Sequence, residues 1–147
     1  MDGTAVVLCD GLFATINGKT AHGLVRGSER YRVIGVIDAP TAGRDAGEVL
    51  DGVRRGIPVF ASLAEALSSL PEKPDYAIVG VATSGGVFTP GLEKALLEAI
   101  ESGLSIVNGL HHLAADQPRL AEAARRRGVT ITDIRRTKSP GELHFWT

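Results

Sequence analysis

Short runs that are apolar on successive residues recur along the chain, and they constrain its fold more than any other feature. They are Ala5–Cys9, Val33–Ile37, Tyr76–Ala82 and Ile106–Val107; a fifth run, Val129–Ile134, follows near the end, and Ile57–Phe60 is a further short candidate. A strand that is apolar on both faces is typical of a parallel sheet covered by helices on each side. The pattern therefore indicates buried parallel strands.

Helix signals lie between these runs. Ser62 and Glu65 form a capping box, and Thr89-Pro90 places a hydroxyl N-cap before a proline at the first helical position. Helices are predicted from about Leu63 to Leu70, from Pro90 to Gly103, from Asp116 to Gly128, and over the shorter segment Lys19–Arg26. The segment Ala39–Gly56 contains five glycines or prolines and is predicted to be a loop, despite a possible capping box from Asp45 to Glu48.

The alternation of strands and helices implies right-handed crossovers in one open sheet. We predict a Rossmann-like α/β fold, with a parallel sheet of five or six strands and helices on both faces. Residues 1–138 would form this domain, and residues 139–147 would form a tail. The core is predicted to contain Val7, Ile34, Val36, Ile78, Val79, Ile106 and Ile131.

Composition narrows the class of partner. The chain has 147 residues, of which 44% are hydrophobic, and 16 basic against 17 acidic residues give a net charge of −1. There is no charge excess that would favour nucleic acid, and no apolar run approaches the roughly 20 residues that span a membrane. The single cysteine, Cys9, excludes an internal disulfide and fits a reducing, cytoplasmic compartment.

The candidate binding residues follow the strands, because ligands of such sheets bind beyond the carboxyl ends of the strands. They are Asp10, Gly11, Asp38, Thr83, Ser84, Gly85, Gly86, Asn108, Gly109 and His111, joined by Lys19 and His22 where a helix opens beside the cleft. The small residues Thr83–Gly86 could expose backbone N–H groups to an anion. We expect one cleft that binds a small anionic ligand.

Two familiar nucleotide signatures are missing. No G-x-G-x-x-G follows the first strand, and Gly18-Lys19-Thr20 lacks the earlier glycine of a phosphate-binding loop, since Phe13 stands in its place. Asp38 has two interpretations: it could accept hydrogen bonds from ribose hydroxyls, or it could cap the turn before Pro40. Adjacent histidines, His111 and His112, do not predict a metal site, and no catalytic residue can be named from spacing.

Two resemblances are carried by these residues. The segments Gly56–Ala66, Pro74–Val81 and Glu98–Gly103 resemble, in a generic way, the CoA-binding domain of succinyl-CoA synthetase. A more specific likeness lies in Asp10–Phe13, Gly18–Leu24, Val36–Asp38, Gly109–His111 and Gly141–Trp146. These segments are similar to the N-terminal Rossmann-like domain of the domain-of-unknown-function 1611 family, whose members resemble D-glutamate N-acetyltransferases.

The second resemblance implies a larger protein in which the tail leads into a P-loop domain, with acetyl-CoA or a nucleotide as cofactor. The leading hypothesis is a domain that supplies part of a substrate or cofactor cleft. The alternatives are a docking or oligomerisation module and a nicotinamide-nucleotide-binding domain. The tail carries Leu143, Phe145 and Trp146, which favours contact with another domain or a homo-oligomer.

Overall fold

The fold was analysed in a computed structural model that describes residues 3–11, 13–14, 19–27, 30–80, 89–108 and 118–133. The strands are β1 (Gly3–Leu8), β2 (Tyr31–Ile37), β3 (Val59–Phe60), β4 (Tyr76–Val79), β5 (Ser105–Asn108) and β6 (Ile131–Asp133). The helices are α1 (Lys19–Arg26), η2 (Ala39–Thr41, a single 3-10 turn), α2 (Ala46–Asp51), α3 (Leu63–Ser69), α4 (Pro90–Glu101) and α5 (Pro118–Arg127).

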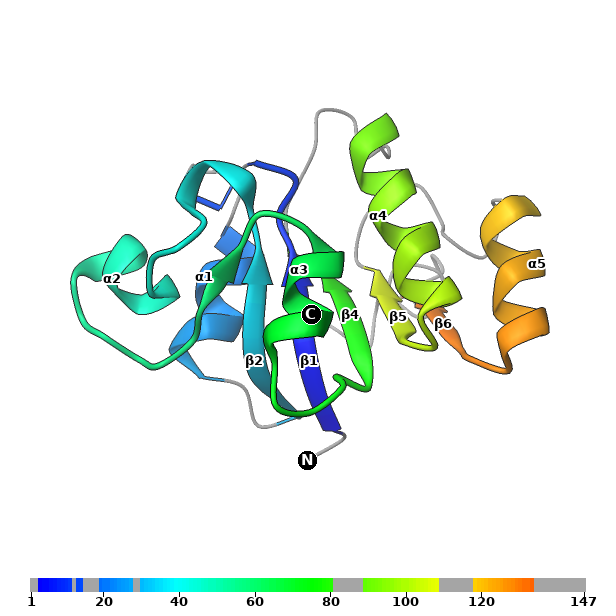
Figure 1. The fold of residues 1–147 in the computed structure, drawn as a ribbon, viewed down its shortest axis with the longest axis horizontal. Helices are drawn as coiled ribbons and strands as arrows, with labels where there is room; N and C mark the ends of the chain where they lie inside the picture. Colours follow the sequence, from blue (N-terminus) through cyan, green and yellow to red (C-terminus); the bar gives the residue numbers. More distant parts are fainter. Residues whose placement is uncertain are drawn as a thin grey trace, which may run out of the picture.

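The six strands form one sheet in the order β3-β2-β1-β4-β5-β6, and every pairing is parallel. The chain runs outward from β1 in one direction and then returns to the other side of β1 to begin β4 (Figure 1). The switch point of the sheet therefore lies between β1 and β4, where ligands of open α/β sheets bind. The predicted Rossmann-like fold is confirmed, with six strands.

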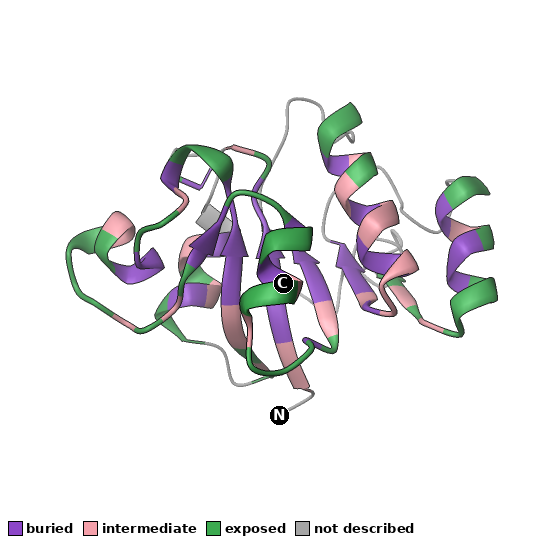
Figure 2. Ribbon diagram, viewed as in Figure 1, coloured by how far each residue is buried: buried purple, intermediate pink, exposed green. Residues whose placement is uncertain are grey.

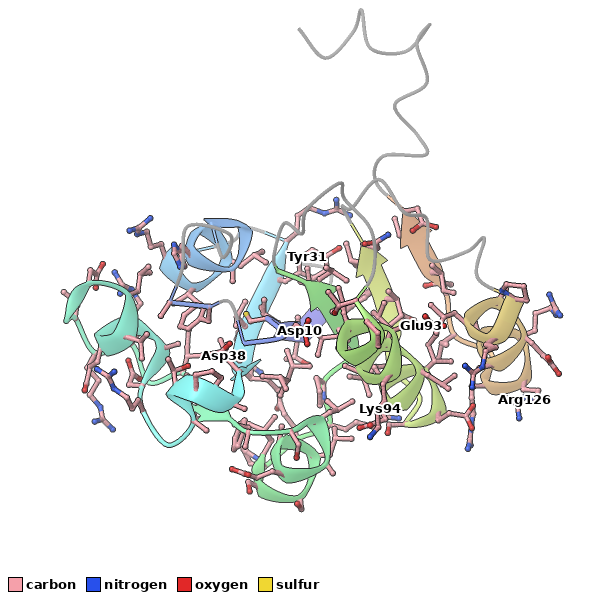
Figure 3. The ribbon with its side chains drawn as sticks, turned by 90° about the horizontal axis from the view of Figure 1, so that it is seen from above. Asp10, Tyr31, Asp38, Glu93, Lys94 and Arg126 are labelled. Atoms are coloured by element: carbon pink, nitrogen blue, oxygen red, sulfur yellow. The ribbon has the colours of Figure 1, made fainter. Side chains whose placement is uncertain are left out.

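The helices divide between the two faces of the sheet. Helix α1 lies on one face with α2 packed beside it, whereas α3, α4 and α5 lie on the other (Figures 1 and 3). Figure 2 shows buried residues along the strands and on the helix sides that face them, as this layering requires. Within the described part of the chain, no helix has the length and apolar character needed to cross a bilayer.

The core matches the apolar runs. Five of the seven predicted core residues are buried, and the other two, Ile34 and Ile131, are partly buried against the same cluster. Ile34 falls where the register between β1 and β2 slips by one residue, so it has no direct partner on β1. Ile131 lies on the edge strand β6, which has a neighbour on one side only.

The prediction of a loop over Ala39–Gly56 is wrong, because this segment contains η2 and α2. The Asp45 carboxylate accepts hydrogen bonds from four backbone N–H groups, those of Gly47, Glu48, Arg55 and Ile57, at 2.9–3.2 Å. Burial opposes ionisation of Asp45, but these four donors outweigh it and lower the pKa of the carboxyl. The capping signal thus prevails over the glycines around it.

A close contact fixes α1 against the centre of the sheet. The Ala21 N–H donates to the Gly80 carbonyl at 2.9 Å, directly beyond β4. A Cβ added at Gly80 would lie 2.2 Å from Val7 Cγ1 and 3.0 Å from Ala21 Cβ. A glycine is therefore needed where α1 meets the end of β4.

Candidate functional site

A pocket of about 360 Å³ opens at the carboxyl ends of β1 and β2, on the face covered by α3 and α4. Its lining comprises Leu8, Cys9, Asp10, Gly11, Ile37, Asp38, Ala39, Ala61, Ser62, Leu63, Gly91, Leu92, Lys94, Ala95 and Glu98. Figure 3 looks onto this edge of the sheet, with Asp10 and Asp38 near its centre and Lys94 on α4. The volume is in the range of small-molecule sites.

Asp10 joins the end of β1 to the start of α4. Its backbone has φ +47°, the left-handed conformation, which Asp tolerates better than most residues. The Thr89 hydroxyl donates to Asp10 Oδ2 at 2.5 Å and also accepts the Leu92 N–H as the N-cap of α4. A Cβ at Gly91 would lie 2.7 Å from Asp10 Oδ1. The first turn of α4 is thus shaped around this carboxylate.

Asp38 follows β2 and is only 1% exposed. Its Oδ1 accepts the Phe13 N–H at 3.2 Å, and its Oδ2 accepts the Thr41 hydroxyl at 2.5 Å. Both carboxylate oxygens therefore have partners within the protein. Asp38 is the N-cap of η2, but its side chain makes no capping hydrogen bond there; it instead links the turn after β1 to the Thr41 side chain.

Cys9 also lines the pocket, but its thiol is not activated. Burial is the main cause that raises the pKa of this thiol well above its usual value, and the negative charge of Asp38 acts in the same direction. The thiol lies 3.9 Å from the Val7 carbonyl oxygen. Cys9 is therefore a protonated wall residue rather than a nucleophile.

Sequence reasoning missed the α4 side of the pocket. Lys94, Ala95 and Glu98 lie along one side of this helix and line the pocket opposite the ends of β1 and β2. Lys94 and Glu98 are four residues apart, a spacing that places them on one helix face. The sequence contains that spacing, but it does not say which side of α4 borders the pocket.

Of the other predicted site residues, one lines the pocket and others lie elsewhere in the fold. Gly11, with φ +81°, lines the pocket. Lys19 begins α1, and His22 Nε2 lies 2.5 Å from the Phe13 carbonyl oxygen. Asn108 ends β5, is fully buried and donates to Asp133 Oδ1 at 2.8 Å; it does not line this pocket.

The remaining candidates lie outside the described residues: Thr83, Ser84, Gly85, Gly86, Gly109 and His111. Among the side chains that the structure describes, no three His, Cys, Asp or Glu residues come together as metal ligands. The site built from described residues is thus the pocket between Asp10, Asp38 and α4.

Strand order, parallel pairing and a pocket beyond the carboxyl ends of β1 and β2 define a Rossmann-like α/β domain. Residues 39–137 match the family described as "Domain of unknown function (DUF1611_N) Rossmann-like domain". The chain belongs to this family.

Relatives are consistent with this assignment. A crystal structure of a DUF1611 family protein from Anabaena variabilis superposes with a TM-score of 0.79 at 32% identity, covering 90% of this chain and 37% of that one. A D-glutamate N-acetyltransferase from Tritonibacter scottomollicae is 40% identical over 58 residues, which are 40% of this chain and 17% of that protein. The chain therefore matches well under half the length of either relative.

Two enzymes share the fold at lower identity. Homoserine dehydrogenase from Thermoplasma acidophilum has a TM-score of 0.56 at 16% identity, covering 89% of this chain and 42% of that one. The 1-deoxy-D-xylulose 5-phosphate reductoisomerase from Zymomonas mobilis, solved with NADPH, has a TM-score of 0.50 at 19% identity, covering 90% and 38%. These likenesses concern the fold alone.

Proposed function

We propose that this domain supplies part of a substrate or cofactor cleft in a DUF1611 protein that acetylates the amino group of a D-amino acid. The pocket at the carboxyl ends of β1 and β2 carries the proposal, because it lies beside the switch point of the sheet. The reaction class comes from the partial match to a D-glutamate N-acetyltransferase, and such a transfer needs an acetyl donor. Acetyl-CoA is the donor we propose.

The charge of the pocket indicates which part of the donor enters it. Asp10, Asp38 and Glu98 line it, against Lys94 as the only basic residue of the described lining. Phosphate groups would be repelled by these carboxylates, whereas hydroxyl and amide groups can donate to the carboxylates of Asp10 and Glu98. We therefore expect an uncharged portion of acetyl-CoA inside the pocket, with the phosphates of this anionic ligand outside it.

A pair of alanines on and beside α3 allows a controlled test. Ala61 is exposed and lines the pocket, so Ala61→Phe should obstruct it without entering the core. Ala64 is also exposed but does not line the pocket, so Ala64→Phe adds the same side chain elsewhere on the same surface. Calorimetric titration with acetyl-CoA should show binding to the wild type and to Ala64→Phe, and at least about tenfold weaker binding to Ala61→Phe.

Titrations with NAD and ATP separate the alternatives. Binding of NAD and not acetyl-CoA would favour a nicotinamide-nucleotide domain. Absence of binding for all three compounds would contradict the proposal and favour a docking or oligomerisation module. Equal affinity of the two phenylalanine variants would show that a bound compound uses a different site.

A further inference from the structure

Both main-chain polar groups of Phe13 are held by side chains from other elements. The Phe13 N–H donates to Asp38 Oδ1, and the Phe13 carbonyl oxygen lies 2.5 Å from His22 Nε2, which donates to it. Asp38 comes from the end of β2 and His22 from α1. The turn after β1 is therefore fixed from two directions.

The surroundings of these contacts are buried. The Phe13 side chain is 1% exposed and belongs to the main core cluster, and its ring meets the His22 ring edge to face with centroids 5.5 Å apart. The second oxygen of Asp38 is occupied by the Thr41 hydroxyl. When both oxygens of a buried carboxylate accept hydrogen bonds from the protein, a ligand hydroxyl that replaces one of these donors removes an internal hydrogen bond.

The held turn includes a wall of the pocket. Asp10 and Gly11 line the pocket and come two or three residues before Phe13, and both have left-handed backbones with φ +47° and +81°. Asp adopts the left-handed conformation more readily than most residues, and contacts on either side restrict it further. The Phe13 contacts lie on one side, and the Thr89 hydroxyl lies on the other.

We infer that Asp38 and His22 are positioning residues: they hold the main chain of Phe13 so that Asp10 and Gly11 keep the shape of the pocket wall. Asp38 acts through Phe13 and does not receive a hydroxyl group of the ligand. The ligand-binding part of this inference rests on the proposed function, whereas the holding of Phe13 does not.

Substitutions at Asp38 separate positioning from direct contact. In Asp38→Asn the amide oxygen still accepts the Phe13 N–H, and the amide nitrogen can donate to the Thr41 hydroxyl oxygen. Asp38→Ala removes both contacts. Hydrogen exchange of the Phe13 amide, followed by NMR without ligand, should be slow in the wild type and in Asp38→Asn, and at least about tenfold faster in Asp38→Ala. Thr41→Val, which keeps the Phe13 contact, is the control and should leave this exchange slow.

Acetyl-CoA affinity should follow the same order. We expect Asp38→Asn to bind within about twofold of the wild type and Asp38→Ala to bind about tenfold more weakly. His22→Ala, which frees the Phe13 carbonyl oxygen, should also weaken binding while leaving the charge of Asp38 in place.

Two results would overturn the inference. One is a Phe13 amide that exchanges equally in the wild type and in Asp38→Ala, since Asp38 would then not hold the turn. The other is Asp38→Asn binding acetyl-CoA as weakly as Asp38→Ala while its Phe13 amide stays protected, since the charge would then contact the ligand directly. If the wild type binds no acetyl-CoA, the proposed function fails and the exchange rates alone decide the role of Asp38.

Discussion

The Thr89 hydroxyl lies 2.5 Å from Asp10 Oδ2, which ties the residue at the end of β1 to the N-cap of α4. These residues are 79 positions apart in the chain. The contact crosses the switch point of the sheet, between the neighbouring strands β1 and β4. It therefore joins Asp10, which lines the pocket, to the first turn of α4, where Gly91 and Leu92 also line it.

The stability of variants at Asp10 should depend on how well the new residue tolerates a left-handed backbone. Asp10→Asn retains an acceptor for Thr89 and tolerates the left-handed conformation, so its free energy of unfolding should stay near that of the wild type. Asp10→Val loses the acceptor and adds a β-branched side chain, which should cost about 2 kcal/mol. Urea denaturation measures both variants. Equal stability of the two would show that neither the left-handed backbone nor the Thr89 contact of Asp10 contributes to stability.

Gly80→Ala should be among the most damaging small substitutions in the domain. Its Cβ would lie 2.2 Å from Val7 Cγ1, so β1, β4 or α1 must move, at a cost of about 3 kcal/mol. Gly23 in α1 is the matched control, because a Cβ there has no neighbour within 4 Å. Gly23→Ala should instead stabilise by about 0.5–1 kcal/mol, through higher helix propensity. Thermal and urea unfolding of the pair would test the packing of α1.

The contribution of Asp45 to the free energy of unfolding should decrease in acid. Its folded-state pKa is lowered, so its contribution is complete above the unfolded-state value of about 3.9 and is lost as the pH falls toward the folded-state value. Asp45→Ala should cost about 2 kcal/mol at neutral pH, because four backbone N–H groups lose their acceptor. The difference in unfolding free energy between wild type and variant should shrink in acid. A difference that stays constant with pH would contradict the role of the ionised carboxylate.

Asp51 provides the comparison for that experiment. The hydrogen bonds from Arg55 are the main cause that lowers the pKa of Asp51 to about 2, but this ion pair is on the surface. Exposed pairs contribute little to stability. Asp51→Asn should therefore leave the free energy of unfolding nearly unchanged at neutral pH.

Cys9 should react slowly with thiol reagents. Its raised pKa keeps the thiol protonated, and the side chain is fully buried. Mass spectrometry after treatment with iodoacetamide in mildly alkaline buffer should show little alkylation of the folded protein and rapid alkylation in denaturant. Rapid alkylation of the native protein would show that the pocket wall opens or that the thiol is ionised.

The order of strands and helices could be predicted because it depends on local patterns. Apolar runs such as Val33–Ile37 identify buried strands, and Thr89-Pro90 identifies the start of α4. Helix α2 was missed because glycines normally interrupt helices. Here Gly47 is required by packing, since a Cβ would lie 2.2 Å from the Val53 carbonyl oxygen, and Gly52 ends the helix in the left-handed conformation.

The candidate site could be predicted only in part. The rule that ligands bind at strand ends identified Asp10, Gly11 and Asp38, all of which line the pocket. The same rule did not identify Lys94 and Glu98, whose position depends on how α4 is rotated against the sheet. Nor could it reveal that Asp38 contacts Phe13, because the path of the turn after β1 is set by tertiary contacts.

The central place of β1 has a consequence for how the protein is made. Strand β1 pairs on one side with β2, the next strand in the sequence. Its other edge pairs with β4, which is synthesised only after β2 and β3. While the ribosome is still producing the residues before Tyr76, the backbone groups of Ala5–Leu8 face an unfilled place in the sheet. An open, apolar strand edge of this kind attracts other chains. Prematurely terminated products that lack β4 should therefore aggregate or depend on chaperones. Once β4 has been synthesised, it can pair with the free edge of β1.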